Sequence, residues 1–120
     1  MRIELLIGKL HQATVTQSDL HYQGSITIDE DLIEAAGFRA HQKVDVYNIN
    51  TGGRFHTYVI RGPRRGRGIC LNGAAARLVQ VGDRVIIAAY GLFEAREALK
   101  HEPHVILLNE KNEIIGRGHG

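Results

Sequence analysis

The sequence has a single cysteine, no tryptophan and only two prolines among its 120 residues. A disulfide needs two cysteines, so the single Cys70 cannot form one within the chain. The apolar neighbours of Cys70 predict a small buried side chain. The longest apolar run, residues 85–93, is far shorter than the roughly 20 residues that span a bilayer. Charges at Arg2, Glu4 and Lys9 interrupt the first apolar residues, which is not the pattern of a signal peptide. We therefore expect a cytoplasmic protein with no membrane partner.

The sequence also lacks a large excess of positive or negative charges, because the formal net charge is only +2 at pH 7. The densest basic stretch is RGPRRGRG, residues 61–68, whose alternating arginine and glycine suits contacts with phosphate groups. No aromatic residue lies in this stretch to stack on bases. A solvated loop therefore explains the stretch better, and we expect no nucleic-acid partner.

The seven histidines are not arranged as metal ligands. A helical metal site places two histidines on one face, about one turn apart. His101 and His104 come closest to that spacing, but Pro103 lies between them and disfavours a helix. The sequence therefore predicts no metal site.

Short segments rich in β-branched residues, separated by turn residues, recur along the whole chain. With 120 residues, the chain is long enough for one domain but not for two ordinary ones. Six or seven short strands favour a closed barrel over an open sheet, because closure removes exposed edges. The segments lie at residues 5–17, 25–28, 43–50, 54–61, 68–72, 83–91 and 104–109.

Two short helices are predicted between these strands. In DEDLIEAAGF, residues 29–38, Asp29 can cap the first turn and Gly37 can end the last one. A second helix is predicted to start at Asn72, which can act as its cap. A third, weaker signal lies in residues 92–102. The class predicted from the pattern is mostly β with short helices.

The dipeptide Gly24-Ser25, within HYQGSITID, can be read in two ways. It can be an ordinary turn between two strands. It can also be a site of self-cleavage, because the Ser25 hydroxyl follows the Gly24 carbonyl directly and can attack it, moving the acyl group from nitrogen to oxygen. Elimination from the resulting ester leaves dehydroalanine, whose hydrolysis gives a pyruvoyl group at residue 25. The dipeptide by itself leaves both interpretations open.

Four stretches taken together resemble the family of pyruvoyl-dependent aspartate 1-decarboxylases, in order and in spacing. They are GKLHQATVT, DLHYQGSITID, GGRFHTYVI and LNGAAARLVQVGD, and the resemblance runs from about Ile7 to Tyr90. It implies a six-stranded double-psi β-barrel assembled as a homotetramer. It also implies self-cleavage of the domain, residues 1–120, between Gly24 and Ser25, into a β chain, residues 1–24, and an α chain, residues 25–120.

The implied activity is conversion of L-aspartate to β-alanine for pantothenate and coenzyme A synthesis. The implied cofactor is a pyruvoyl group derived from Ser25, with no metal and no pyridoxal phosphate. Some members of the family need an accessory protein to mature, and the sequence does not decide whether this chain does. Charge alone would equally suit glutamate as the substrate.

The resemblance assigns roles to residues that have simpler interpretations. Lys9 and Arg54, otherwise surface charges, are implied to bind the substrate carboxylates, for which a planar guanidinium is well suited. Thr57 is implied to lie near the Gly24 carbonyl, to assist self-cleavage and to bind substrate. Tyr58 is implied to return a proton after decarboxylation, which requires that it reach the reacting carbon.

The stretch that follows residue 71 has a double interpretation too. Asn72 can be no more than a helix cap, whereas the resemblance places its amide beside the pyruvoyl group. Backbone N–H groups of Gly73, Ala74 and Ala75 are implied to bind a substrate carboxylate. His11 and Tyr22 are further candidates for the pocket, and Tyr47 stands where several members of the family carry tryptophan. Two other functions stay open at this point: a non-catalytic adaptor barrel and a nucleic-acid-binding module.

Overall fold

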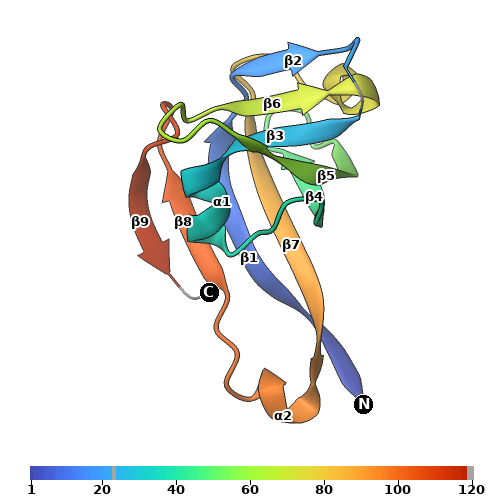
Figure 1. Cartoon of the computed structure of the whole chain (residues 1–120), viewed down its shortest axis with the longest axis vertical. Helices are drawn as coiled ribbons and strands as arrows, with labels where there is room; N and C mark the ends of the chain where they lie inside the picture. Colours follow the sequence, from blue (N-terminus) through green and yellow to red (C-terminus); the bar gives the residue numbers. More distant parts are fainter. Residues whose placement is uncertain (23, 119–120) are drawn as a thin grey trace.

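The computed structural model describes residues 1–22 and 24–118. In this part of the chain the fold consists of nine strands, two α-helices and one 3-10 helix (Figure 1). The strands are β1 (Arg2–Thr14), β2 (Gln17–Asp19), β3 (Ser25–Asp29), β4 (Lys43–Asn48), β5 (Arg54–Gly62), β6 (Ile69–Asn72), β7 (Arg84–Glu94), β8 (His104–Leu108) and β9 (Ile114–Gly118). The helices are α1 (Glu30–Ala36), the 3-10 helix η1 (Gly73–Leu78) and α2 (Ala95–Ala98).

The strands pair in the order β2-β6-β3-β5-β4-β7-β1-β8-β9. Only Val15 and Thr16 separate β1 from β2, so one bent strand joins the two ends of the run from β2 to β1. At this bend the Val15 amide donates to the Asp83 carbonyl and the Thr16 amide to the Ile69 carbonyl, both at 2.9 Å. Counting β1 and β2 as one strand, six strands form the barrel, while β8 and β9 extend it beyond β1. The predicted class, a mostly β double-psi barrel with short helices, is confirmed.

The core fills the barrel because alternate residues of each strand point inward. On β4, Val44 and Val46 are fully buried, and their neighbours on the other face are only partly covered. Leu10 pairs with Ile87 across β1 and β7, and both side chains have no exposed surface. This alternation decides which candidate residues face outward, as described below.

A long arm projects from the barrel (Figure 1). β1 and β7 pair from Arg2 opposite Glu94 to Thr14 opposite Arg84, and α2 lies near the far end of this arm (Figure 1). The arm exposes large apolar side chains, including Leu92 at 62%. A surface of this kind is typical of a contact between proteins.

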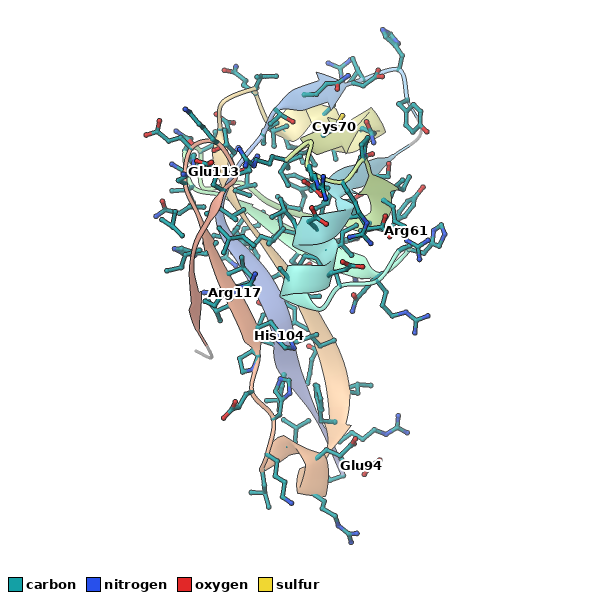
Figure 2. All side chains as sticks on the ribbon, turned by 60° about the vertical axis from the view of Figure 1, so that its left-hand side comes forward. Arg61, Cys70, Glu94, His104, Glu113 and Arg117 are labelled. Atoms are coloured by element: carbon teal, nitrogen blue, oxygen red, sulfur yellow. The ribbon has the colours of Figure 1, made fainter. Side chains whose placement is uncertain are left out.

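Helix α1 forms as predicted, because its ends are set by local chemistry. The Asp29 carboxylate accepts a hydrogen bond from the Asp31 amide at 2.8 Å, and Gly37 ends the helix in the left-handed conformation, with φ of 74°. Two arginines of the basic loop, Arg61 and Arg64, pair with carboxylates of this helix, and Figure 2 shows Arg61 beside it. Arg64 donates to Asp31 and to Glu34, each at 2.7 Å. These ion pairs fit the predicted solvated loop.

The other two helices are shorter than predicted. The helix after Asn72 is a 3-10 helix, and the Asn72 side chain does not cap it. The signal in residues 92–102 yields only the single turn α2, because β7 continues through Glu94. Within residues 1–22 and 24–118, no helix is long and apolar enough to span a membrane.

Candidate active site

The Gly24-Ser25 peptide lies where an exposed turn enters the buried strand β3. Ser25 has no exposed surface, whereas Gly24 is exposed. Ser25 pairs with Asn72 on β6, and the next residue, Ile26, pairs in parallel with Val59 on β5. Strand β3 is therefore held on both sides by neighbouring strands, while Gly24, which precedes it, is exposed.

Asn72 holds the Ser25 hydroxyl. Its amide Nδ2 donates to Ser25 Oγ at 2.9 Å and to Thr27 Oγ1 at 3.0 Å, and the Asn72 residue is only 3% exposed. The predicted alternative, a helix cap, is wrong, because this amide is engaged by β3 instead of by η1. A donor on Oγ stabilises negative charge that develops on that oxygen, as donors do in oxyanion sites.

A hydrogen bond from Cys70 orients the Asn72 amide. The Cys70 Sγ donates to Asn72 Oδ1 at 3.1 Å, which leaves the Nδ2 end facing Ser25. Burial, followed by the nearby charge of Asp19, raises the pKa of the Cys70 thiol, so the thiol keeps the proton that it donates. Cys70, predicted as a small buried side chain, is only half-buried, and its thiol is hydrogen bonded.

Gly73 packs directly against the Gly24 backbone. Its φ is 65°, in the left-handed region that favours glycine. A Cβ at Gly73 would lie 2.7 Å from both the nitrogen and the Cα of Gly24, and 2.9 Å from the Tyr22 carbonyl oxygen. Only a glycine lets η1 begin this close to the Gly24-Ser25 peptide, and Ala74 and Ala75 follow it with small side chains on η1.

Thr57 and Tyr58 lie level with the candidate peptide. Extending the parallel register of Ile26 and Val59 by one and two residues puts Tyr58 beside Ser25 and Thr57 beside Gly24. Adjacent strand residues face opposite sides of a sheet, and Thr57 pairs with the buried Val44. Tyr58 therefore shares the outer face with Ser25 and is 37% exposed, whereas Thr57 points toward the barrel interior.

Lys9 and His11 form a second group, which the strand order separates from Ser25, whereas Arg54 lies at the start of β5, the strand beside β3. Lys9 and His11 are on β1, and β7, β4 and β5 lie between β1 and β3. Lys9 pairs with Ala88, while Arg54 pairs with Tyr47 on β4. Their strand neighbours Leu10 and Phe55 belong to the core, so Lys9 and Arg54 point outward on one continuous face.

His11 lies at the edge of this second group. Burial, followed by the charges of Lys9 and Arg84, lowers its pKa, so His11 is neutral at pH 7. Its Nδ1 is buried and has no hydrogen-bond partner. Tyr22, the other pocket candidate, is 54% exposed beside Gly73 and contributes its carbonyl oxygen there.

Sequence reasoning missed two residues of the Ser25 group, Thr27 and Cys70. Thr27 on β3 pairs with Cys70 on β6. The next two pairs along these strands are Ile26 with Leu71 and Ser25 with Asn72. The signal was the strand alternation, which puts residues 25 and 27 on one face and residues 70 and 72 opposite them. It becomes visible only once the register between the strands is known.

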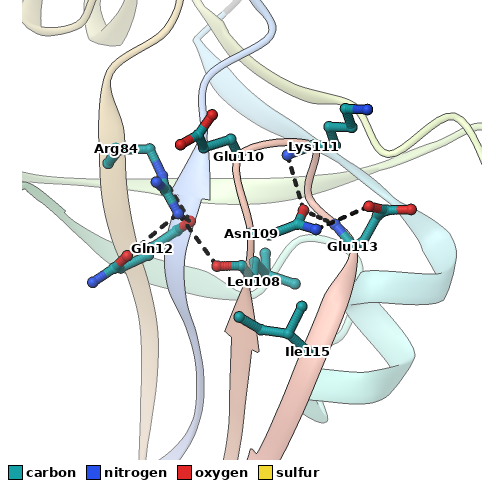
Figure 3. A pocket seen from close by; sticks show the side chains of 8 residues that line it. All are labelled: Gln12, Arg84, Leu108, Asn109, Glu110, Lys111, Glu113 and Ile115. Atoms are coloured by element: carbon teal, nitrogen blue, oxygen red, sulfur yellow. Dashed lines mark hydrogen bonds between the residues drawn. The ribbon is translucent and has the colours of Figure 1, made fainter.

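A separate hollow of about 400 Å³ lies at the turn between β8 and β9 (Figure 3). The Arg84 guanidinium donates there to the carbonyls of Gln12 at 2.7 Å and Leu108 at 3.2 Å, so its donors are engaged by backbone. The hollow is lined by residues other than those of either group described above. Across the described ranges, 1–22 and 24–118, no three metal-ligating side chains gather into one group.

Comparison with known proteins gives a family match over almost the whole chain. The family model described as aspartate decarboxylase matches residues 1–115. An aspartate 1-decarboxylase of Maricaulis maris is 57% identical over 117 residues, covering 98% of this chain and 97% of that protein. One from Caldicellulosiruptor saccharolyticus is 56% identical over 115 residues, covering 96% and 90%. One from Bacillus pumilus is 57% identical over 109 residues, covering 91% and 86%.

Among solved structures, the chain is similar to the crystal structure of the computationally designed msDPBB_sym2 protein. The TM-score is 0.47 at 15% identity, covering 72% of this chain and 96% of that one. A likeness at this level adds nothing to the fold assignment, which the strand pairing supports independently.

Proposed function

This chain belongs to the aspartate decarboxylase family, and on that premise we propose how its own residues carry out the family's reaction. It converts L-aspartate to β-alanine and carbon dioxide, the pyruvoyl-dependent step that supplies β-alanine for pantothenate biosynthesis. Relatives that are more than half identical over almost the whole chain all carry this one activity in their names. An adaptor barrel or a nucleic-acid-binding module is therefore not favoured.

The proposed maturation begins at the Ser25 hydroxyl. Its Oγ attacks the Gly24 carbonyl carbon, the bond from that carbon to the Ser25 nitrogen breaks, and the nitrogen takes up a proton. Loss of the Ser25 α-proton then breaks the bond between Cβ and Oγ, so that Gly24 leaves as a carboxylate. Water replaces the amine as ammonia, giving chains of residues 1–24 and 25–120.

The residues around Ser25 support these steps. Asn72 Nδ2 donates to Oγ at 2.9 Å. The same donor can stabilise the negative charge that develops on this oxygen when it leaves as part of the Gly24 carboxylate. Gly24 is exposed, and a Cβ at that position would meet no atom within 4 Å, so the carbonyl can be approached. Thr57, level with Gly24 by register, is the proposed donor to the Gly24 carbonyl oxygen.

A pyruvoyl group at residue 25 fits these surroundings, because the departure of Oγ with Gly24 would free the buried Asn72 Nδ2 to donate to an oxygen of the group. When present, the group supplies a ketone that accepts the electrons released by the departing carboxylate, so no pyridoxal phosphate and no metal is needed. Tyr58, on the same face as Ser25, is the proposed proton donor to the product carbon. Backbone N–H groups of Gly73, Ala74 and Ala75 are proposed to bind one substrate carboxylate.

Lys9 and Arg54 enter the proposal through a second copy of the chain. Both are cations suited to the carboxylates of aspartate, but three strands separate Lys9 from Ser25, and Arg54 lies three residues before Thr57 on β5. A neighbouring copy can bring its own Lys9 and Arg54 to Ser25, with its His11 beside Lys9, while Tyr22 lies beside Gly73 on the Ser25 side. The exposed apolar arm offers a contact surface for such an assembly. We infer a homotetramer on these grounds.

Mass spectrometry of the purified protein tests the maturation. We expect two chains, residues 1–24 and 25–120, with the longer one lighter by one ammonia than a chain that begins with serine. Cleavage without any addition would show that no maturation factor is needed, whereas cleavage only after adding cell extract would show that one is. Full activity in protein of intact, unaltered mass would contradict the proposal.

An Arg54→Ala variant separates maturation from substrate binding. We expect complete self-cleavage and a fall of about 100-fold in kcat/KM for aspartate, because hydrogen bonds to charged groups contribute about 1.5–3 kcal/mol. Steady-state kinetics beside a denaturing gel measures both. Arg117→Ala, which removes an exposed arginine on β9, is the matched control and should change neither. Normal kinetics in Arg54→Ala would remove Arg54 from the site.

A further inference from the structure

The Arg54 side chain stacks on the Tyr47 ring. The two residues pair across β4 and β5, and the guanidinium carbon of Arg54 lies 4.3 Å from the centre of the Tyr47 ring. A guanidinium over an aromatic face is attracted by the ring, and the contact limits the rotamers open to a long, exposed side chain. The Arg54 cation is therefore held in one direction before any ligand arrives.

The Tyr47 ring is itself tethered at its far end. Its hydroxyl oxygen lies 2.9 Å from that of Tyr90 on β7, and it donates to Asp45 Oδ2 at 3.5 Å. Either hydroxyl can be the donor in the bond between the two tyrosines. Burial and the neighbouring Tyr90 raise the pKa of Tyr47 to about 12, so its hydroxyl stays protonated at neutral pH.

The tether spans the outer face between the two proposed carboxylate-binding cations. Tyr47 pairs with Ile86 on β7, and Tyr90 lies four residues further along that strand. Ala88, which lies between Ile86 and Tyr90 on this face of β7, is only 1% exposed. Ala88 pairs on its other side with Lys9. The tyrosine pair thus lies between Lys9 on β1 and Arg54 on β5.

We propose that Tyr47, tethered by Tyr90, is a positioning residue that orients the Arg54 guanidinium for the substrate carboxylate. This inference rests on the proposed role of Arg54 in binding aspartate. Stacking covers one flat side of the guanidinium and leaves its edge N–H groups free to form the two parallel bonds that a carboxylate accepts. An arginine fixed in this way loses less conformational freedom when the ligand binds.

The test uses four variants that separate the effect of the Tyr47–Arg54 stacking from that of the Tyr47–Tyr90 hydrogen bond. Tyr47→Leu removes both, Tyr47→Phe and Tyr90→Phe remove only the hydroxyl bond, and Tyr47→Trp keeps an aromatic face under Arg54. Two properties are measured in each: the Kd of succinate, a dicarboxylate without an amine, by calorimetry, and the KM and kcat for aspartate. A gel records the fraction that has cleaved itself, and thermal unfolding records folding.

We expect Tyr47→Leu to raise the succinate Kd and the aspartate KM about 10-fold, with kcat and self-cleavage unchanged. Tyr47→Trp should restore both constants to within about 2-fold, and the two phenylalanine variants should lie between. Ile115→Ala, which shortens an exposed apolar side chain on β9, should behave as the wild type. Unchanged constants in Tyr47→Leu, or a fall in kcat with unchanged KM, would overturn the proposal.

Arg54→Ala distinguishes failure of this inference from failure of the proposed function. If Arg54 binds the carboxylate and Tyr47 acts through it, Tyr47→Leu should have no further effect in the Arg54→Ala background, as a double-mutant cycle detects. Weak succinate binding in Arg54→Ala but normal binding in Tyr47→Leu would overturn the positioning role alone. Normal succinate binding in Arg54→Ala would overturn the role of Arg54, and with it this inference.

Discussion

A Ser25→Ala variant is expected to fold, to remain one uncut chain and to form no β-alanine. Alanine has no oxygen to attack the Gly24 carbonyl, so neither the ester nor the pyruvoyl group can form. The fold should survive, because the change leaves the Asn72 amide one bond to Thr27 and costs about 1 kcal/mol of stability for the lost hydrogen bond. A denaturing gel, an assay for β-alanine and thermal unfolding together measure the three outcomes.

Ser18→Ala provides the matched control for Ser25→Ala. The Ser18 hydroxyl donates to the Ala76 carbonyl at 3.3 Å, but Ser18 is exposed and lies on β2. The control should cleave and turn over aspartate as the wild type does. Turnover in Ser25→Ala at the wild-type rate would show that the reaction does not depend on a group made from Ser25.

A Gly73→Ala variant should cleave itself far more slowly than the wild type, or not at all, and should be less stable. The left-handed φ of 65° costs an alanine about 1–2 kcal/mol. The new Cβ would also lie 2.7 Å from the Gly24 nitrogen, so either η1 or the Gly24-Ser25 peptide must shift. Because that peptide is the bond to be cut, a shift of this kind displaces the carbonyl from the Ser25 hydroxyl. The rate of fragment formation and the unfolding midpoint report the two effects.

Gly52→Ala separates backbone strain from the steric effect. Gly52 has a comparable φ of 80°, but a Cβ there would meet no atom within 4 Å. The control should lose a similar amount of stability from backbone strain and still cleave at the normal rate. If Gly73→Ala also cleaved normally, close contact between residue 73 and Gly24 would not matter for maturation.

The parts of the fold that local chemistry controls could be predicted from the sequence. Helix α1 begins at the Asp29 cap and ends at Gly37, as expected, because both signals act within a few residues. The helix after Asn72 could not be predicted in the same way. Its expected cap is engaged instead by Ser25 and Thr27, more than forty positions earlier in the chain. A long-range hydrogen bond thus overrode a local preference.

Which candidate residues lie together could not be predicted from the sequence. Alternation along one strand indicates that Lys9 and His11 share a face, yet it does not say which strands lie between them and Ser25. Nothing local marks Cys70 as a partner of Asn72, because that contact depends on the register of β3 against β6.

The bend at Val15 and Thr16 gives the proposed scission an unusual outcome. Residues 1–24 contribute β1 and β2 to the barrel, and these pair with β7 on one side and with β6 on the other. Cutting after Gly24 therefore does not liberate a peptide. It converts a single polypeptide into two chains, and the shorter one can leave only if its strand pairing in the barrel is broken. In the mature protein, dissociation of the two chains therefore requires unfolding of the barrel.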